Sequence, residues 1–175
     1  MPVSIHAMSA PLFLRMLQNM NTWLDKAEAH ATAKKFDVNN LLQARLAPDM
    51  IDLAGQYRIA TAWAKNGACR LANQTPPDFP DTDKTLAELR ARNLRTSDIL
   101  SSLNPKDFAG SDERMLTVPL GPEIKLNVSG TEYLFNLTFT NFYFHVTTAY
   151  AILRHNGVEL GKGDFLAGAV NVPGR

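Results

Sequence analysis

The sequence predicts an all-α protein, a four-helix bundle with two long connections and a small extended or hairpin segment before the last helix. Three observations support this fold class. Four segments place apolar side chains at helical spacing, and two of them begin at capping-box patterns. Two of the connections between these segments are long, which favours a bundle that is not a plain up-down-up-down arrangement.

Composition limits the class of protein and of partner. A chain of 175 residues predicts one domain over residues 1–175, large enough to bury a core without staples. Its 18 basic and 17 acidic side chains leave a net charge of +1, so we expect no nucleic-acid partner and no membrane surface. No apolar run is long enough to span a bilayer, and Arg15 interrupts the N-terminal apolar segment, so we expect no signal peptide. The single Cys69 cannot form an internal disulfide, which predicts a cytoplasmic protein.

The first helix is predicted at residues 10–30. Ser9 is a suitable N-cap, and Pro11 is tolerated in the first turn. Apolar side chains then recur every three or four positions, at Phe13, Met16, Leu17, Met20, Leu24 and Ala27. A long connection, over residues 34–48, follows this helix.

The second helix is predicted at residues 49–72, with Pro48 at its start. Its buried face is expected to hold Leu53, Tyr57, Ala60, Ala64, Ala68 and Leu71. The alanines on this face allow a neighbouring helix to approach closely. Gln56 lies beside this face, so it is either a hydrogen-bonded polar group at the edge of the core or a site residue. Cys69 is expected to behave as a small buried apolar residue.

The third helix is predicted at residues 83–103. Thr82 or Asp83 can cap it, and Thr85 with Glu88 forms a capping-box pattern. Asn104 and the proline that follows it end the helix. Residues 106–128 contain two short extended pieces, at 115–118 and 124–128, which predict a small hairpin or an ordered loop packed as a cap on the bundle.

The last helix is predicted at residues 130–155, in the longest stretch without a helix breaker. Ser129 and Glu132 form a capping-box pattern, and Gly157 can adopt the left-handed conformation that ends a helix. Residues 137–148 are rich in Phe, Tyr, Thr and Val, which suit a strand better, but the length and the two caps favour a helix. One stripe of this helix, partly polar, would hold Leu134, Thr138, Asn141, His145, Thr148 and Ile152.

Common catalytic signatures are absent from the sequence. It has no phosphate-binding loop, no GxGxxG, no HExxH, no GxSxG and no paired cysteines. What remains is Asn141 four residues before His145, on the same face of a helix. Two histidines at this spacing could share a metal ion, but an amide oxygen is a weak ligand for zinc or nickel. His145 is therefore either a buried, hydrogen-bonded histidine, which predicts no bound metal, or a metal ligand.

Several polar side chains are candidates for a pocket between the second and fourth helices. The candidate ligand-pocket residues are His145, Asn141, Gln56, Thr148, Tyr143 and Tyr150.

Three segments resemble a known family. They are residues 141–157 (NFYFHVTTAYAILRHNG), residues 160–166 (LGKGDFL) and residues 44–50 (ARLAPDM). They are similar to an uncharacterised bacterial family that is described only as a domain of unknown function and is placed in the DinB/YfiT-like superfamily. The likeness extends over about residues 5–168. The resemblance implies a DinB-like four-helix bundle with a right-handed, long-connection topology, often found as a homodimer.

The resemblance also implies the place where a metal would bind. In that superfamily three histidines bind the metal, one from the second helix and two from an HxxxH pair on the fourth. Members with this set include metal- and thiol-dependent transferases and isomerases. His145 matches one histidine of the pair, but Asn141 stands four residues before it and Ala149 four residues after it. On the second helix Gln56 is the polar residue nearest the expected place, so the sequence departs from the metal-binding pattern.

Two functions from different classes remain open. The first is a non-catalytic or small-ligand-binding bundle with a polar pocket between the second and fourth helices and no cofactor. The alternative is a DinB-like metal-dependent enzyme, of transferase or hydrolase type, with a degenerate zinc or nickel site centred on His145. We expect a homodimer, because not all aromatic side chains of the last helix can face one core: Phe135, Phe139, Phe142, Tyr143 and Phe144.

Overall fold

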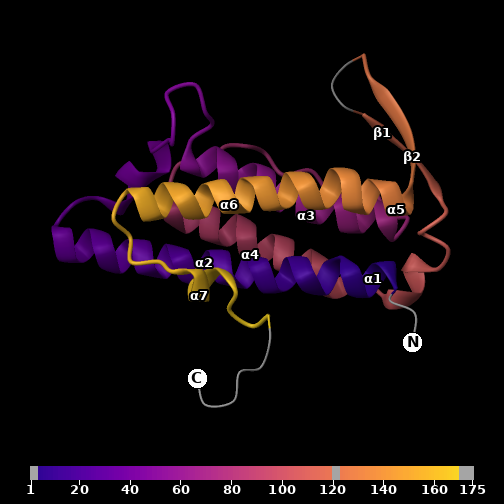
Figure 1. The fold of residues 1–175 in the computed structure, drawn as a ribbon, viewed down its shortest axis with the longest axis horizontal. Coiled ribbons are helices and arrows are strands. Elements are labelled where there is room, and N and C mark those ends of the chain that lie inside the picture. The colour runs from indigo at the N-terminus through magenta and orange to yellow at the C-terminus, as the bar shows by residue number, and fades with distance from the viewer. Residues whose placement is uncertain (1–3, 120–122, 170–175) are drawn as a thin grey trace.

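The computed structural model describes residues 4–119 and 123–169. Four long helices run along one axis and form a bundle (Figure 1). They are α2 (Ala10–Lys34), α3 (Leu53–Leu71), α4 (Leu86–Ser102) and α6 (Thr140–His155). Helix α3 packs against α6 and α4, α4 packs against α2, and α2 completes the ring by contacting α6. The predicted four-helix bundle is confirmed.

The two long connections place consecutive helices on the diagonals of the bundle. The order around the ring is α2, α4, α3 and α6, so α2 lies diagonally opposite α3, and α4 lies diagonally opposite α6. Residues 35–52, which include the 3-10 helix η1 (Val38–Gln43), lead from α2 to α3, and residues 103–129 lead from α4 toward α6. The connection over residues 72–85 joins neighbouring helices. The long connections predicted from the sequence are thus the ones that cross the bundle.

The hairpin before the last helix is confirmed, but it does not cap the bundle. Strands β1 (Met115–Pro119) and β2 (Lys125–Ser129) pair antiparallel and project away from the helices at the end where α5 (Gly130–Glu132) begins (Figure 1). Val118 is buried, but Met115 is 63% exposed, and most other side chains of the two strands are exposed or half-buried. The hairpin therefore offers no continuous apolar face to the bundle. Residues 120–122, within the expected turn, lie outside the described residues.

Two capping boxes begin helices where the sequence places them. The hydroxyl of Thr85 accepts from the backbone N–H of Glu88, and the Glu88 carboxylate accepts from the N–H of Thr85. Ser129 and Glu132 form the same reciprocal pair at the start of α5. Each pair satisfies two backbone donors that a helix start leaves free.

The predicted start of α2 at residue 10 is confirmed, with Ser9 at the N-cap position. The Ser9 side chain does not cap the helix, however, because a short helix, α1 (Ile5–Met8), precedes it and the Ser9 hydroxyl donates back to the carbonyl of Ile5 at 2.7 Å.

Two other predicted starts were wrong. Helix α4 begins at Leu86 rather than at 83, because Thr85 caps it in place of Thr82 or Asp83. Helix α3 begins at Leu53 rather than at 49, because Asp52 caps it in place of Pro48. Its carboxylate accepts from the backbone N–H of Gly55 at 2.8 Å.

Residues 130–155 are helical throughout, so the strand alternative for residues 137–148 is excluded. The helix is not uniform, however. Between α5 and α6 lies a π-helical segment, η3 (Tyr133–Phe139), which the sequence did not predict. Gly157 ends the helix with a φ of 86°, in the left-handed conformation expected of it. Within the described residues, no helix is long and apolar enough to cross a bilayer.

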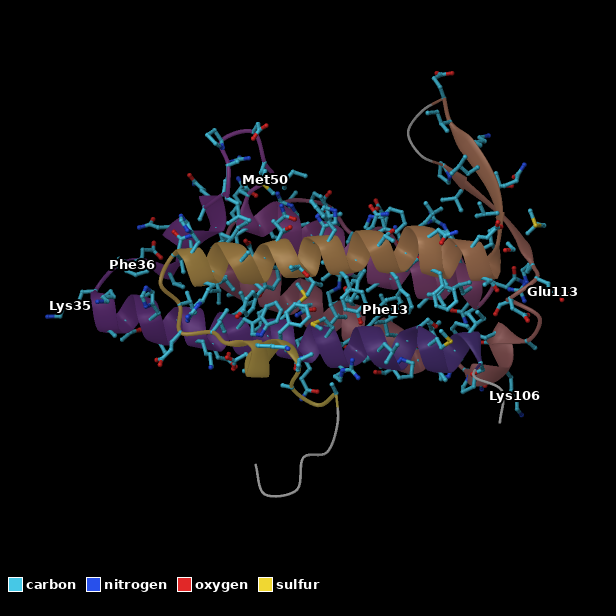
Figure 2. The ribbon with its side chains drawn as sticks, in the orientation of Figure 1. Phe13, Lys35, Phe36, Met50, Lys106 and Glu113 are labelled. Carbon is cyan, nitrogen blue, oxygen red and sulfur yellow. The ribbon has the colours of Figure 1, made fainter. Side chains whose placement is uncertain are left out.

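Aromatic side chains join α2 to α6 in the core. Figure 2 shows Phe13 inside the bundle, and its ring meets the ring of Phe142 edge-on with the centroids 4.8 Å apart. Phe139 meets Phe13 in the same way at 5.7 Å. Across the diagonal, the buried hydroxyl of Tyr57 donates to the carbonyl of Met20 at 2.9 Å, and burial raises the pKa of that hydroxyl. Much of the aromatic surface of the last helix is therefore covered within the chain.

Candidate functional site

The polar stripe predicted on the last helix lies along the seam between α3 and α6. His145 and Thr148 are buried, and Asn141 is half-buried. Gln56 faces them from α3 and is 1% exposed. The seam is the most extensive helix contact that α3 makes. It brings together four of the candidate residues.

A short hydrogen bond joins Gln56 to His145 across this seam. The two side chains approach through Oε1 of Gln56 and Nδ1 of His145, which lie 2.7 Å apart. The Gln56 amide nitrogen donates to the carbonyl of Ile51 at 3.0 Å, which turns its oxygen toward the imidazole. Because an amide oxygen can only accept, Nδ1 of His145 must carry the hydrogen. In the neutral ring the lone pair then lies on Nε2.

The Nε2 atom is free to meet a ligand. Among the described residues Nε2 has no hydrogen-bond partner. The fully buried polar atoms that lack a partner belong to other residues, so Nε2 is partly exposed to solvent. Burial of the imidazole lowers the pKa of His145, which favours the neutral form. One exposed apolar side chain lies beside the pair: the ring of Phe144 meets the imidazole edge-on at 5.2 Å. The side chain of Ile51 lies close to Gly55, and the contact with Gln56 is made by its backbone carbonyl.

Asn141 and Thr148 lie on the same stripe but bond to their own helix. The Asn141 amide nitrogen donates to the carbonyl of Leu137 at 2.7 Å. The Thr148 hydroxyl donates to the carbonyl of Phe144 at 2.8 Å. Each side chain thus donates within its own helix, and the Asn141 amide oxygen, which has no partner among the described residues, is the acceptor that this part of the stripe adds.

Tyr143 and Tyr150 lie away from this site. At about 100° per residue, positions two before and five after His145 fall on roughly the opposite side of the helix. The ring of Tyr143 packs against Phe142 with the centroids 5.2 Å apart, and burial raises the pKa of its hydroxyl. The ring of Tyr150 packs against Trp23 at 5.6 Å. The structure therefore does not bring these two tyrosines to His145.

The side chains at the seam do not fit the three-histidine metal set that the family resemblance implies. His145 is the one imidazole, and the amide of Gln56 is engaged with its Nδ1 rather than pointing toward a shared centre. Within residues 4–119 and 123–169 there is no group of three or more His, Cys, Asp or Glu side chains that could hold a metal ion. Catalytic zinc sites typically use three protein ligands.

Two features of α3 escaped the sequence analysis. Gly67 lies so close to the π-helical segment that an added Cβ would stand 2.4 Å from Cγ2 of Thr138, whose hydroxyl is fully buried without a partner. Lys65 is buried as well, 4% exposed, beside Arg92 of α4, which is 5% exposed. The sequence could have indicated that Lys65 is buried, because it lies four residues after Thr61, on a second buried face of the helix.

Comparison with known proteins agrees with this fold. The family model described as "Domain of unknown function (DUF1993)" matches residues 5–166. A solved structure of a DinB family member from Shewanella denitrificans is 40% identical to this chain, with a TM-score of 0.87. The match covers 98% of this chain and 94% of that one. No curated protein matches the sequence. The resemblance stated from the sequence is confirmed: the chain belongs to the DUF1993 family and has a DinB-like fold.

Proposed function

We propose that this DUF1993 protein binds a small molecule at the α3–α6 seam without catalysing a reaction, and that Nε2 of His145 accepts a hydrogen bond from the ligand. The observation that carries the proposal is the 2.7 Å contact between Gln56 and Nδ1 of His145. It holds the ring in one tautomer and orientation, so the lone pair of Nε2 has a fixed direction. A preoriented acceptor lowers the cost of binding a donor group.

The surroundings of Nε2 indicate the class of ligand. Phe144 is 58% exposed, and its ring lies beside the imidazole, where it offers apolar contact. Small-molecule sites commonly combine such apolar walls with a few fixed polar groups. A ligand with an N–H or O–H donor next to an aromatic or aliphatic group fits this combination. The free amide oxygen of Asn141 offers a second acceptor on the same stripe.

The alternative is a metal-dependent enzyme with a degenerate zinc or nickel site centred on His145. One observation favours it: an imidazole that donates through Nδ1 to a neighbouring oxygen, with Nε2 free, has the arrangement of many metal-bound histidines. The lack of further donors counts against tight binding, because one imidazole and neutral amides do not replace three ligands. Cys69 offers no activated nucleophile, since it is buried and burial raises the pKa of its thiol. We therefore propose that the protein has no resident metal.

The test uses protein without a histidine tag, labelled with ¹⁵N in its histidines. Phenol, which has an O–H donor, should shift the Nε2 resonance of His145 in a saturable way, whereas toluene should not. The control is His145→Asn, which keeps a donor toward Gln56 but lacks Nε2. The resonance that phenol shifts in the wild type must be missing from the spectrum of this variant. If phenol at saturating concentration leaves Nε2 unchanged, the ligand proposal fails.

Elemental analysis of the same protein separates the two functions. We expect far less than one zinc or nickel ion per chain. A content near one ion per chain that is lost in His145→Ala, at an unchanged melting temperature, would replace the binding proposal with the metal-dependent enzyme.

We also infer a cytoplasmic location and a homodimeric state. The unpaired, buried Cys69 supports a reducing compartment. The exposed Phe144 on α6 supports a contact between two copies.

A further inference from the structure

A second candidate site lies on another side of α3. Lys65 follows Gln56 by nine residues, which places it about 180° around the helix, away from α6. There a cleft of about 320 Å³ opens between α3, Arg92 of α4 and the connection over residues 72–85. We propose that this cleft binds a small anion carrying a carboxylate or phosphate group. The proposal is independent of the function assigned to His145.

Lys65 is a buried cation without a paired charge. Its side chain is 4% exposed, its ammonium donates to the carbonyl of Pro77, and it lies 4.3 Å from the centroid of the Phe79 ring. Among the described residues no carboxylate oxygen lies within 4.0 Å of Nζ. Burial lowers the pKa of Lys65, and the more distant Asp78 opposes this effect. A carbonyl and an aromatic ring compensate a buried cation less fully than a negative charge does, so an anion that enters the cleft stabilises the ammonium further.

Arg92, by contrast, is already paired. Its Nε donates to Asp83 at 2.7 Å, and its Nη2 donates to Asp81 at 3.1 Å and to the carbonyl of Pro80. These bonds hold the connection over residues 72–85 against α4. Prolines at positions 76, 77 and 80 stiffen the same segment. The wall of the cleft is thus formed before a ligand arrives, which favours binding.

The charges are distributed unevenly around the cleft: two carboxylates hold Arg92 on one side, so the positive excess is confined to the α3 side, at Lys65 and Arg70. The cleft is lined by three cations, Lys65, Arg70 and Arg92, and by the carboxylates of Asp78 and Asp81. Because Arg92 is paired with Asp81 and Asp83, Lys65 and Arg70 face only Asp78 among the lining carboxylates. Arg70 donates to the hydroxyl of Tyr133 at 3.0 Å, which positions its guanidinium without neutralising it.

The size and the lining of the cleft match a small oxyanion. A cleft of about 320 Å³ suits a small metabolite rather than a polymer. A guanidinium and an ammonium are the groups that proteins use to hold carboxylates and phosphates. Asn66 adds an amide at the same wall.

Titration calorimetry tests the proposal with two probes, inorganic phosphate and succinate, each at an ionic strength held constant with sodium chloride. We expect at least one probe to bind with one site per chain and to raise the melting temperature. In Lys65→Met the dissociation constant should rise at least ten-fold. The control is Lys106→Met, which removes the same charge from an exposed side chain at one end of the bundle and should stay within two-fold of the wild type (Figure 2).

The two probes distinguish a phosphate ligand from a carboxylate ligand. Binding of phosphate alone identifies a phosphate ligand, and binding of succinate alone identifies a carboxylate. If neither probe binds more tightly than chloride, or if Lys65→Met binds as the wild type does, the proposal is overturned. Should Lys65→Met lose its cooperative melting, Arg70→Gln gives the same comparison. In His145→Asn the binding should be unchanged, so a failure at this cleft is distinct from a failure at the seam.

Discussion

At the scale of single residues, one amide decides what His145 can do. The oxygen of Gln56, on α3, is held toward Nδ1 by the amide's own bond to the carbonyl of Ile51. An amide that accepts from the ring orients it but adds no strong metal donor. The pair therefore fixes the imidazole by hydrogen bonding and leaves the lone pair of Nε2 on the other side of the ring.

The first prediction concerns the stability that this pair contributes. His145→Ala should lower the free energy of unfolding by roughly 1–3 kcal/mol, because it leaves a cavity and an unpaired buried oxygen on Gln56. His145→Asn should lose less, since its amide can still donate to that oxygen. Urea denaturation measures both values. Equal losses in the two variants would show that the hydrogen bond is not what stabilises the seam.

The second prediction concerns pH. Burial lowers the pKa of His145 in the folded protein below its usual value of 6.5. Above that value the imidazole is neutral in both states, and its contribution to stability is complete. As the pH falls below about 6.5 the unfolded chain takes up the proton first, so stability falls until the folded pKa has been passed. The melting temperature of His145→Asn should fall less over the same range, and parallel curves for the two proteins would contradict the assignment.

At the scale of elements, the π-helical segment depends on the absence of a side chain at Gly67. An added Cβ there would lie 2.4 Å from Cγ2 of Thr138, which is a stiff β-branched side chain in η3. The close contact between α3 and η3 therefore requires glycine at this position. π-helical turns are frequent at functional sites, and this one leads into the helix that carries His145.

The third prediction tests this contact. Gly67→Ala should destabilise the protein by up to about 2 kcal/mol, because overpacking costs about 1–3 kcal/mol and the gain in helix propensity offsets about 1 kcal/mol of it. Adding Thr138→Ser removes Cγ2 and should recover most of the loss. A double-mutant cycle of unfolding free energies measures the coupling. Strictly additive effects would mean that the two residues do not meet as described.

The fourth prediction concerns the start of α4. Thr85→Ala should cost about 1 kcal/mol of stability, because it removes the acceptor for the backbone N–H of Glu88. Thr82→Ala is the matched control, at an exposed threonine three residues earlier that lies outside the helix. Thermal unfolding of both variants measures the difference. A loss in Thr82→Ala as large as that in Thr85→Ala would place the cap elsewhere.

At the scale of the whole molecule, α3 is the helix around which the possible functions are arranged. One side of it faces α6 and carries Gln56, and another faces α4 and carries Lys65. Both polar groups are more than nine-tenths buried. A helix can hold two such groups only if each meets a partner, and here the partners come from distant parts of the chain.

The fifth prediction concerns assembly. Of the aromatic side chains on the last helix, Phe142 is fully buried, whereas Phe144 is 58% exposed. We expect light scattering to give a mass near twice the 19.3 kDa of one chain at high micromolar concentration. Phe144→Glu should shift the mass toward one chain, while Leu94→Glu, at another exposed apolar position on α4, should not. A mass near 19.3 kDa for the wild type would refute the dimer.

The sequence by itself determined the features that depend on neighbours within about four residues. The periodicity of the apolar side chains located the four helices, and the capping pairs at Thr85 and Ser129 located two of their starts. The same spacing placed Asn141, His145 and Thr148 on one stripe. These interactions are local, so they can be inferred before the chain is folded.

Only the tertiary structure decided which groups meet across the bundle. The bond between Gln56 and His145 joins residues 89 positions apart, and the pairing of Lys65 with the connection over residues 72–85 depends on how that segment folds back on α3. The close approach of Gly67 to Thr138 in the π-helical segment likewise joins residues that are far apart in the sequence. Helical spacing already separates Tyr143 and Tyr150 from His145, and the tertiary structure decided only which rings they meet, Phe142 and Trp23. Helical spacing tells which residues share a face, but the packing of the other helices decides what that face touches.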